Sequence, residues 1–150
     1  MIYAGIGARA TPGDILGLMT AAACYLDLKG YRLRSGGAKG ADTAFELGST
    51  NKEIFRPEDA TEAALELASM IHPAWDRCAE WTKKAHARNC MILLGKELDH
   101  EVDFVLCYTA DGKASGGTGQ ALRLAEREGI KIFNMYYPEI QGRVQNMISK

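Results

Sequence analysis

Residues 31–42 read YRLRSGGAKGAD, a short strand pattern that runs into a glycine-rich turn and then into a helix pattern. Two more glycine-rich turns stand at similar points of the chain, GIGAR at residues 5–9 and SGGTGQ at residues 115–120. Parallel strands end at the same edge of a sheet, so three such turns would meet there. Glycine lets backbone N–H groups approach an anion, and helix N-termini add partial positive charge. The three turns together predict a cradle for a phosphate or a nucleotide.

Strand and helix patterns alternate along almost the whole chain. Short apolar or alternating runs predict strands at residues 1–6, 31–34, 52–56, 102–108 and 130–134. Helical spacing of apolar residues predicts helices at residues 12–29, 41–47, 58–70, 76–94 and 121–128, and a last one after Pro138. The alternation predicts one domain over residues 1–150, an α/β fold with a doubly wound, Rossmann-like, mainly parallel sheet and helices on both faces.

Two details of these helices are also expected from local sequence. Thr11 stands directly before Pro12, and this order predicts that Thr11 caps the first helix. The helix at residues 58–70 is expected to bury one stripe of apolar side chains. That stripe consists of Ala63, Ala64, Leu67 and Met70.

Composition and charge restrict the class of partner. The chain has 150 residues, 47% of them hydrophobic and 25% charged, with a net charge of −1. Proteins that bind nucleic-acid backbones over a broad surface are usually basic, so a single-stranded DNA partner here would need a local basic patch. No apolar run approaches the roughly 18 residues that cross a bilayer, and the N-terminus does not resemble a signal peptide. We therefore expect a cytoplasmic protein with no membrane partner.

The cysteines and histidines suggest no metal centre. The four cysteines are widely spaced and form no CxxC pair, which predicts buried, reduced thiols. They are Cys24, Cys78, Cys90 and Cys107. The three histidines (His72, His86 and His100) are scattered along the chain. We expect no metal site and no cofactor.

The candidate ligand-binding residues are those of the three turns together with the adjacent pair Arg88 and Asn89. They are Gly5, Gly7, Ala8, Arg9, Ser35, Gly36, Gly37, Ala38, Lys39, Asp42, Arg88, Asn89, Ser115, Gly116, Gly117, Thr118, Gly119 and Gln120. Each turn also has a plainer interpretation, in which its glycines only relieve a tight strand-to-helix connection. Asp42 either caps its helix or bonds a ribose or base, and Arg9 either binds phosphate or lies on the surface. Trp75 and Trp81 either pack in the core or line a groove, or they serve as stacking platforms.

Two familiar phosphate-binding motifs are absent from these turns. Residues 36–41 lack the GK[ST] ending of a Walker loop. Residues 5–9 lack the third glycine of the dinucleotide fingerprint, so they do not predict NAD binding.

The three turns, in this order, resemble the DNA-processing protein A (DprA, or Smf) family and the wider SLOG superfamily of Rossmann-like nucleotide binders. Residues 35–42 resemble the family pattern SGxAxGxD, and residues 116–119 resemble its G[ST]GT-type turn. The resemblance covers roughly residues 2 to 134 and is greatest to small stand-alone members from phages and bacteria. It implies a nucleotide-shaped pocket at the strand ends. Relatives often dimerise, so it also implies a homo-oligomer.

This superfamily includes three kinds of protein, which gives three hypotheses. The first is a module that binds or senses a nucleotide or nucleotide-derived ligand, in a phage or a defence system. The second is a nucleoside 5′-monophosphate phosphoribohydrolase or similar N-glycosidase, with Asp42, Glu46 or Glu126 as its carboxylate. The third is a DprA-like mediator that binds single-stranded DNA through a basic rim.

Residue identities in the third turn favour the first hypothesis. The phosphoribohydrolase pattern resembles PGGxGTxxE, in which a glutamate assists glycosidic cleavage. In this chain Gln120 occupies the threonine position and Arg123 occupies the glutamate position. A cation cannot stabilise a developing oxocarbenium ion, so the sequence predicts binding rather than hydrolysis.

Overall fold

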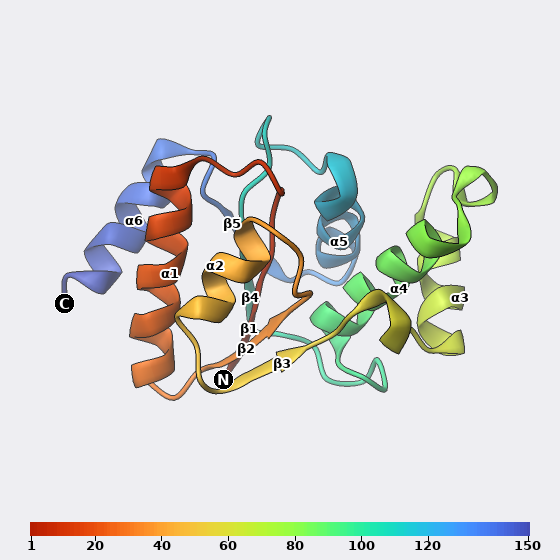
Figure 1. The fold of residues 1–150 in the computed structure, drawn as a ribbon, viewed down its shortest axis with the longest axis horizontal. Helices are drawn as coiled ribbons and strands as arrows, with labels where there is room; N and C mark the ends of the chain where they lie inside the picture. Colours follow the sequence, from red (N-terminus) through yellow and green to blue (C-terminus); the bar gives the residue numbers. More distant parts are fainter.

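Five parallel strands form a single sheet in the order β3-β2-β1-β4-β5 (Figure 1). The structure is a computed structural model that describes all of residues 1–150. The strands are β1 Ile2–Gly5, β2 Arg32–Ser35, β3 Lys52–Ile54, β4 Phe104–Cys107 and β5 Lys131–Asn134. Each lies within the predicted range or extends one residue beyond it. The predicted parallel α/β sheet is confirmed.

Six α-helices cover the two faces of this sheet (Figure 1). One face carries α1 Gly13–Leu28, α2 Ala41–Leu47 and α6 Pro138–Ile148. The other carries α3 Glu62–Ile71, α4 Glu80–Leu94 and α5 Gly116–Arg127, and two short 3₁₀ turns, η1 Pro57–Asp59 and η2 Trp75–Arg77, precede α3 and α4. Helices on both faces confirm the doubly wound architecture.

Side chains of the central strands point alternately to the two faces of the sheet, and both faces are buried. Tyr3 of β1 packs into the cluster formed with α1 and α2, whereas the next residue, Ala4, packs into the cluster formed with α4 and α5. Val105 and Leu106 of β4 divide in the same way. Successive side chains of a strand point to opposite faces, so a strand covered on both sides must be apolar throughout.

The middle of the chain is less regular than its pattern predicts. The segment predicted as one helix over residues 58–70 is interrupted after η1, and Thr61 begins α3 by accepting a hydrogen bond from Ala64 N at 3.1 Å. The predicted apolar stripe is wrong in part, because Ala63 and Met70 are exposed while Ala64 and Ala68 are fully buried. The second predicted helix, 76–94, is likewise divided into η2 and α4.

Two other local expectations are also corrected. Thr11 does not cap α1, because its hydroxyl donates to Ala8 O at 2.6 Å and so closes the loop after β1. All four cysteines are free, but only Cys90 and Cys107 are buried, and burial raises the pKa of each to about 12. Cys24 is exposed on α1 and Cys78 is half-buried after η2.

The strand order places a topological switch point between β1 and β4. From β1 the chain moves outward to β2 and β3 on one side, and the later strands β4 and β5 are added on the other side. The loops that leave β1 and β4 therefore diverge at the carboxyl edge of the sheet, where doubly wound folds have their ligand crevice. None of the helices has the length and apolar character that a bilayer crossing requires.

Candidate functional site

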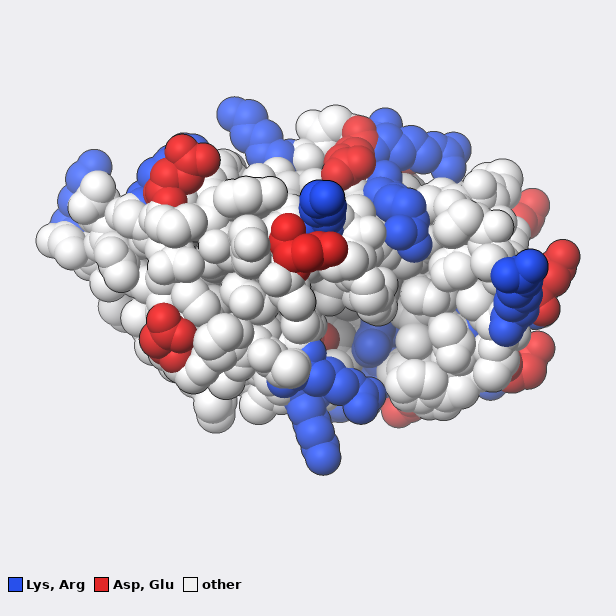
Figure 2. Space-filling view, turned by 90° about the horizontal axis from the view of Figure 1, so that it is seen from above, with Lys and Arg blue, Asp and Glu red and all other residues white.

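Two adjoining cavities lie at the carboxyl edge of the sheet, with volumes of about 290 and 240 Å³. Arg9, Ala38, Trp81 and Arg88 line both of them, and we call the two together the crevice. The first cavity lies between the end of β1 and the starts of α2 and α5, with α4 as its remaining wall. Figure 2 looks onto this edge and shows lysine and arginine side chains gathered beside a hollow in the surface.

Tight packing alone explains the glycines of the first turn. A Cβ on Gly5 would lie 2.5 Å from Cγ of Phe45, and one on Gly7 would lie 2.7 Å from Cβ of Ala41. These glycines let α2 pack closely against β1. The plainer interpretation of glycine therefore accounts for this turn, although Gly7, Ala8 and Arg9 still line the first cavity.

In the second turn, glycine is required by backbone conformation and by crowding. Gly37 and Gly40 have φ angles of +68° and +85°, a region that side chains with a Cβ rarely adopt. A Cβ on Gly36 would lie 2.8 Å from both Arg88 Nη1 and Asp42 Oδ2. The turn thus lets a guanidinium and a carboxylate both approach the position where a Cβ of Gly36 would lie.

The third turn is open at its first two glycines, whereas a Cβ on Gly119 would lie 2.7 Å from the Ala114 carbonyl. Gly116 and Gly117 begin α5, and a Cβ on either would meet nothing within 4 Å. The N–H groups of Gly117 and Thr118 make no backbone hydrogen bond, since the first amides of a helix have no partner in the preceding turn. Both residues line the first cavity. The start of α5 therefore presents unpaired donors to the crevice.

Asp42 is buried in the first turn of α2 and faces the crevice. Its carboxylate accepts a hydrogen bond from Ala38 N at 3.4 Å, and α2 has Gly40 at its N-cap with no side-chain cap, so the capping alternative for Asp42 is wrong. Burial raises the pKa of Asp42 to about 6, against the opposing effects of Arg88 and of the nearby backbone amides. A carboxyl group with this pKa changes its protonation state just below neutral pH.

Arg88 places a positive charge at the base of the crevice. Its Nη1 donates to the carbonyl oxygens of Gly36 at 2.7 Å and Phe55 at 3.2 Å, and its Nε donates to Asn89 Oδ1 at 3.0 Å. Nη2 has no hydrogen-bond partner in the protein, and the side chain lines both cavities. Burial lowers the pKa of Arg88 from its high usual value. The negative charge of Asp42 opposes this lowering, and the guanidinium remains charged.

Exposed cations and one aromatic ring surround the opening. Arg9, Lys39 and Arg56 line the second cavity with Arg88, opposed by a single acid, Glu58. Trp81 on α4 lines both cavities with 59% of its surface exposed. Trp81 therefore lies in a groove rather than in the core, and its exposed ring is available for stacking.

The structure brings together most, but not all, of the predicted site residues. Those that line the crevice are Gly7, Ala8, Arg9, Gly36, Gly37, Ala38, Lys39, Asp42, Arg88, Asn89, Gly117 and Thr118. Those that do not are Gly5, Ser35, Ser115, Gly116, Gly119 and Gln120.

The polar residues outside the crevice have partners in the scaffold. Ser35 donates its hydroxyl to Gly5 O at 2.5 Å, and Gln120 donates to Ala68 O at 3.1 Å. Of the candidate carboxylates, Glu46 pairs with Lys52 at 3.1 Å, and Glu126 is exposed beside a separate depression. Asp42 is the one candidate carboxylate in the crevice.

Several crevice residues were not predicted. Arg56 comes from the segment after β3, and Thr82, Ala85 and His86 come from α4. Arg56 ends the predicted strand at residues 52–56, but no glycine-rich turn follows it, and no local signal marks the three positions on α4. The three α4 residues reach the crevice because α4 packs against β2 and η1, a placement that only the tertiary structure determines.

The expectation that the histidines are dispersed is wrong for two of them. His72 and His86 have ring centroids 4.7 Å apart, and Cys78 lies beside them. Burial lowers the pKa of His86 to about 4, with further lowering from His72 and Arg123, and burial also lowers the pKa of His72. Both imidazoles are therefore neutral at pH 7.

The fold and crevice define a class, that of Rossmann-like, doubly wound α/β proteins. A scan against protein-family models gave no match, and searches of curated proteins and of solved structures also found none. The resemblance to the DprA family stays a prediction from the three turns.

Proposed function

We propose that this protein binds a nucleotide or a nucleotide-derived ligand in the crevice, as a binding or sensing module. The observation that carries the proposal is the convergence of three groups at the switch point. These are the unpaired amides at the start of α5, the free Nη2 of buried Arg88 and the exposed ring of Trp81. Amides and arginine suit a phosphate, and an aromatic face suits a base.

The charges around the crevice favour an anionic ligand. The second cavity has four cations and one acid among its lining side chains. In the proposed mode the phosphate lies between Arg88, Arg9 and the N–H groups of Gly117 and Thr118. Asp42 then accepts a hydrogen bond from a ribose hydroxyl, the role that an acid often has in doubly wound nucleotide-binding folds.

The size of the crevice favours a small molecule. Ligand pockets commonly measure about 300–1,000 Å³, and the two adjoining cavities together fall within that range. A DNA strand would instead need a groove that follows its backbone past several nucleotides. Single-stranded DNA binding is therefore the less favoured alternative.

A second candidate function is hydrolysis of a nucleoside monophosphate, and the position of Asp42 favours it. A carboxyl group with a pKa of about 6 inside a ligand cavity can donate or accept a proton near neutral pH. In this mechanism Asp42 would assist cleavage of the bond between base and ribose.

Calorimetry with a panel of mononucleotides, dinucleotides and cyclic nucleotides tests the proposal. We expect at least one to bind, and we expect Arg9→Ala and Trp81→Ala to weaken it by roughly five- to 100-fold, the range for loss of one stacked base or one charge-assisted contact. Both side chains are exposed, so their truncation should leave the fold intact. Arg127→Ala, an exposed arginine on α5 outside the crevice, is the matched control.

Absence of binding by every nucleotide at millimolar concentration would overturn the proposal. Release of free base by the wild-type protein, lost in Asp42→Asn, would establish the hydrolase instead. A gel shift of single-stranded DNA that weakens steeply with salt, without any nucleotide binding, would favour the DNA alternative.

A further inference from the structure

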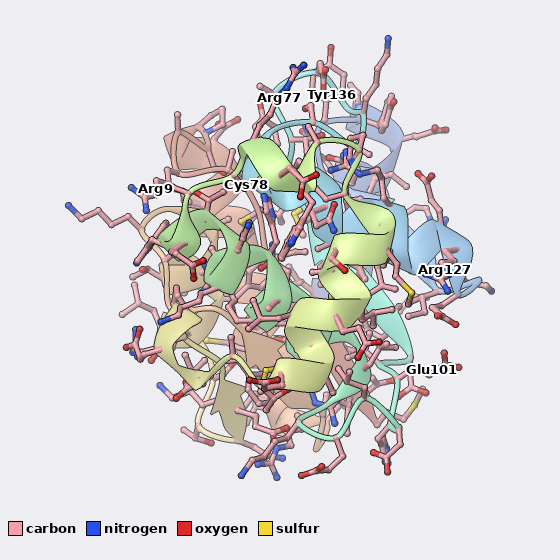
Figure 3. The ribbon with its side chains drawn as sticks, turned by 90° about the vertical axis from the view of Figure 1, so that its right-hand side faces the viewer. Arg9, Arg77, Cys78, Glu101, Arg127 and Tyr136 are labelled. Atoms are coloured by element: carbon pink, nitrogen blue, oxygen red, sulfur yellow. The ribbon has the colours of Figure 1, made fainter.

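A cluster of two imidazoles and one thiol lies beside the crevice, in the connection between α3 and α4. His72 directly follows α3, Cys78 directly follows η2, and His86 is on α4. One ligand atom of each lies within 4.8 Å of the others. Figure 3 shows Cys78 on the loop that joins the two helices.

The spacing of these atoms is close to that of a tetrahedral metal site. Zinc bonds of about 2.0–2.1 Å to nitrogen and 2.3 Å to sulfur place neighbouring ligand atoms roughly 3.3 to 3.8 Å apart. Cys78 Sγ is 3.8 Å from Nε2 and 4.0 Å from Nδ1 of His72. Small side-chain rotations would bring the remaining atoms to bonding distance.

The hydrogen bonds of the cluster leave ligand positions unfilled. Nδ1 of His86 is buried without a hydrogen-bond partner, although buried polar atoms are normally paired. The thiol of Cys78 makes one long hydrogen bond to a backbone atom, Ala74 O, at 3.6 Å. Neither group has a partner that explains its position in the fold.

We propose that His72, Cys78 and His86 bind a zinc ion. One thiolate with two imidazoles is a ligand set suited to zinc rather than to magnesium or calcium, and three protein ligands leave a fourth position for water. On binding, the Cys78 thiol loses its proton to solvent, and both imidazoles ligate as neutral rings. If His72 ligates through Nδ1, its hydrogen bond from Ala74 N is exchanged for the metal bond.

The charges around the site are compatible with a divalent cation once the thiolate has formed. Arg123 acts on both imidazoles, and Arg88 also acts on His86. The guanidinium of Arg123 donates to Gln120 Oε1 at 2.9 Å and to Ala114 O at 3.4 Å, while its Nε is buried without a partner. The thiolate would offset one positive charge of the metal. Lys83 lies over the ring of Trp75, at 5.5 Å from its centroid.

The proposed ion would anchor residues 72–79, a segment that is not part of the sheet. Residues 72–79 contain only one short 3₁₀ turn, whereas α4 is firmly buried through Ala87 and Cys90. A metal shared by His72, Cys78 and His86 would tie this loop to α4. This inference does not depend on nucleotide binding in the crevice.

Cobalt(II) substitution in the full chain tests the site, since tetrahedral cobalt–thiolate sites absorb in the near ultraviolet and visible. We expect one equivalent of cobalt to produce a thiolate-to-metal charge-transfer band, and zinc to abolish it by displacement. Cys78→Ser should lose the charge-transfer band, and His86→Gln should weaken binding at least tenfold. Cys24→Ser, which alters the exposed cysteine on α1, is the matched control and should keep both band and affinity.

Circular dichroism of each variant confirms that it is folded before the titration. Zinc should also raise the melting temperature of the wild-type protein and of Cys24→Ser, but not that of Cys78→Ser. The proposal is wrong if the wild-type protein gives no charge-transfer band, or if folded Cys78→Ser retains it. Loss of the band in Cys24→Ser would also contradict it.

Discussion

At the scale of single residues, Arg88 joins the crevice to the scaffold. Its Nη1 is the donor for the carbonyl oxygens of Gly36 and Phe55, so Arg88→Gln would leave buried acceptors without a partner. We expect this substitution to lower the free energy of unfolding by about 2–4 kcal/mol. Urea denaturation measures the change, with exposed Arg127→Gln as a control that should stay within about 0.5 kcal/mol of wild type. Equal stability of the two variants would contradict the assigned role of Arg88.

Asp42 makes the stability of the protein depend on pH. Its folded-state pKa of about 6 lies above the usual 3.8, so the folded protein holds the proton more tightly than the unfolded chain. Ionised Asp42 therefore destabilises the fold fully above about pH 6, partly between pH 4 and 6, and not below. Asp42→Asn should exceed wild type in stability at pH 7.5, by at most about 3 kcal/mol, and this advantage should shrink toward pH 4.

Urea denaturation of both proteins at pH 4 and pH 7.5 checks this expectation. Asp14→Asn, which alters an exposed carboxylate in α1, is the control and should show little pH-dependent difference. The same stability difference between Asp42→Asn and wild type at both pH values would contradict the raised pKa.

At the scale of secondary-structure elements, the start of α5 differs from other helical positions in its function. Gly117 in α5 and Gly142 in α6 both have open space at the position of a Cβ, and neither has a positive φ. Alanine at either position should not lower stability, and it can add up to about 1 kcal/mol, because glycine is a poor helix former. Only Gly117→Ala should weaken nucleotide binding, since Gly117 lines the crevice. Thermal unfolding and calorimetry measure the two effects, and equal affinity in both variants would contradict a ligand at the start of α5.

The elements themselves were largely predictable, because their signals are local. Glycine marks the ends of β1 and β2, Pro57 follows shortly after β3, and the buried strands β1 and β4 carry the clearest apolar patterns. The largest errors fall in residues 57–79, where capping by Thr61 and two 3₁₀ turns interrupt patterns that appear continuous in the sequence. Capping interactions of this kind depend on backbone geometry that apolar spacing does not report. In addition, α5 begins at Gly116, five residues before the predicted start of that helix.

The site was predictable only in the part built from strand ends. Asp42 and Gly117 could be placed because parallel strands share one edge. Trp81 and His86 reach the crevice from α4, and no local sequence signal indicates this position. Gln120 points away from the crevice and donates to Ala68 O, which the sequence also does not indicate. The same crossover brings together His72 and Cys78, six residues apart, with His86.

At the scale of the whole molecule, the doubly wound order determines where the crevice lies. The crevice is at the β1–β4 switch point, at the end of the molecule where the starts of α2 and α5 come together (Figure 1). The chain as a whole is nearly neutral, so the basic side chains at this edge are a local concentration rather than a general feature. The expected homo-oligomer stays a prediction from the family resemblance.

A nitrogen–proton correlation NMR titration with the tightest-binding nucleotide of the panel tests the central claim most directly. The account predicts that the largest shifts occur at the backbone amides of Gly36, Gly37, Gly117 and Thr118 and at the indole N–H of Trp81. Amides at the opposite edge of the sheet, such as those of Ile2 and Arg32, should not move. Shifts confined to residues outside the crevice, or no shifts at millimolar nucleotide, would contradict it.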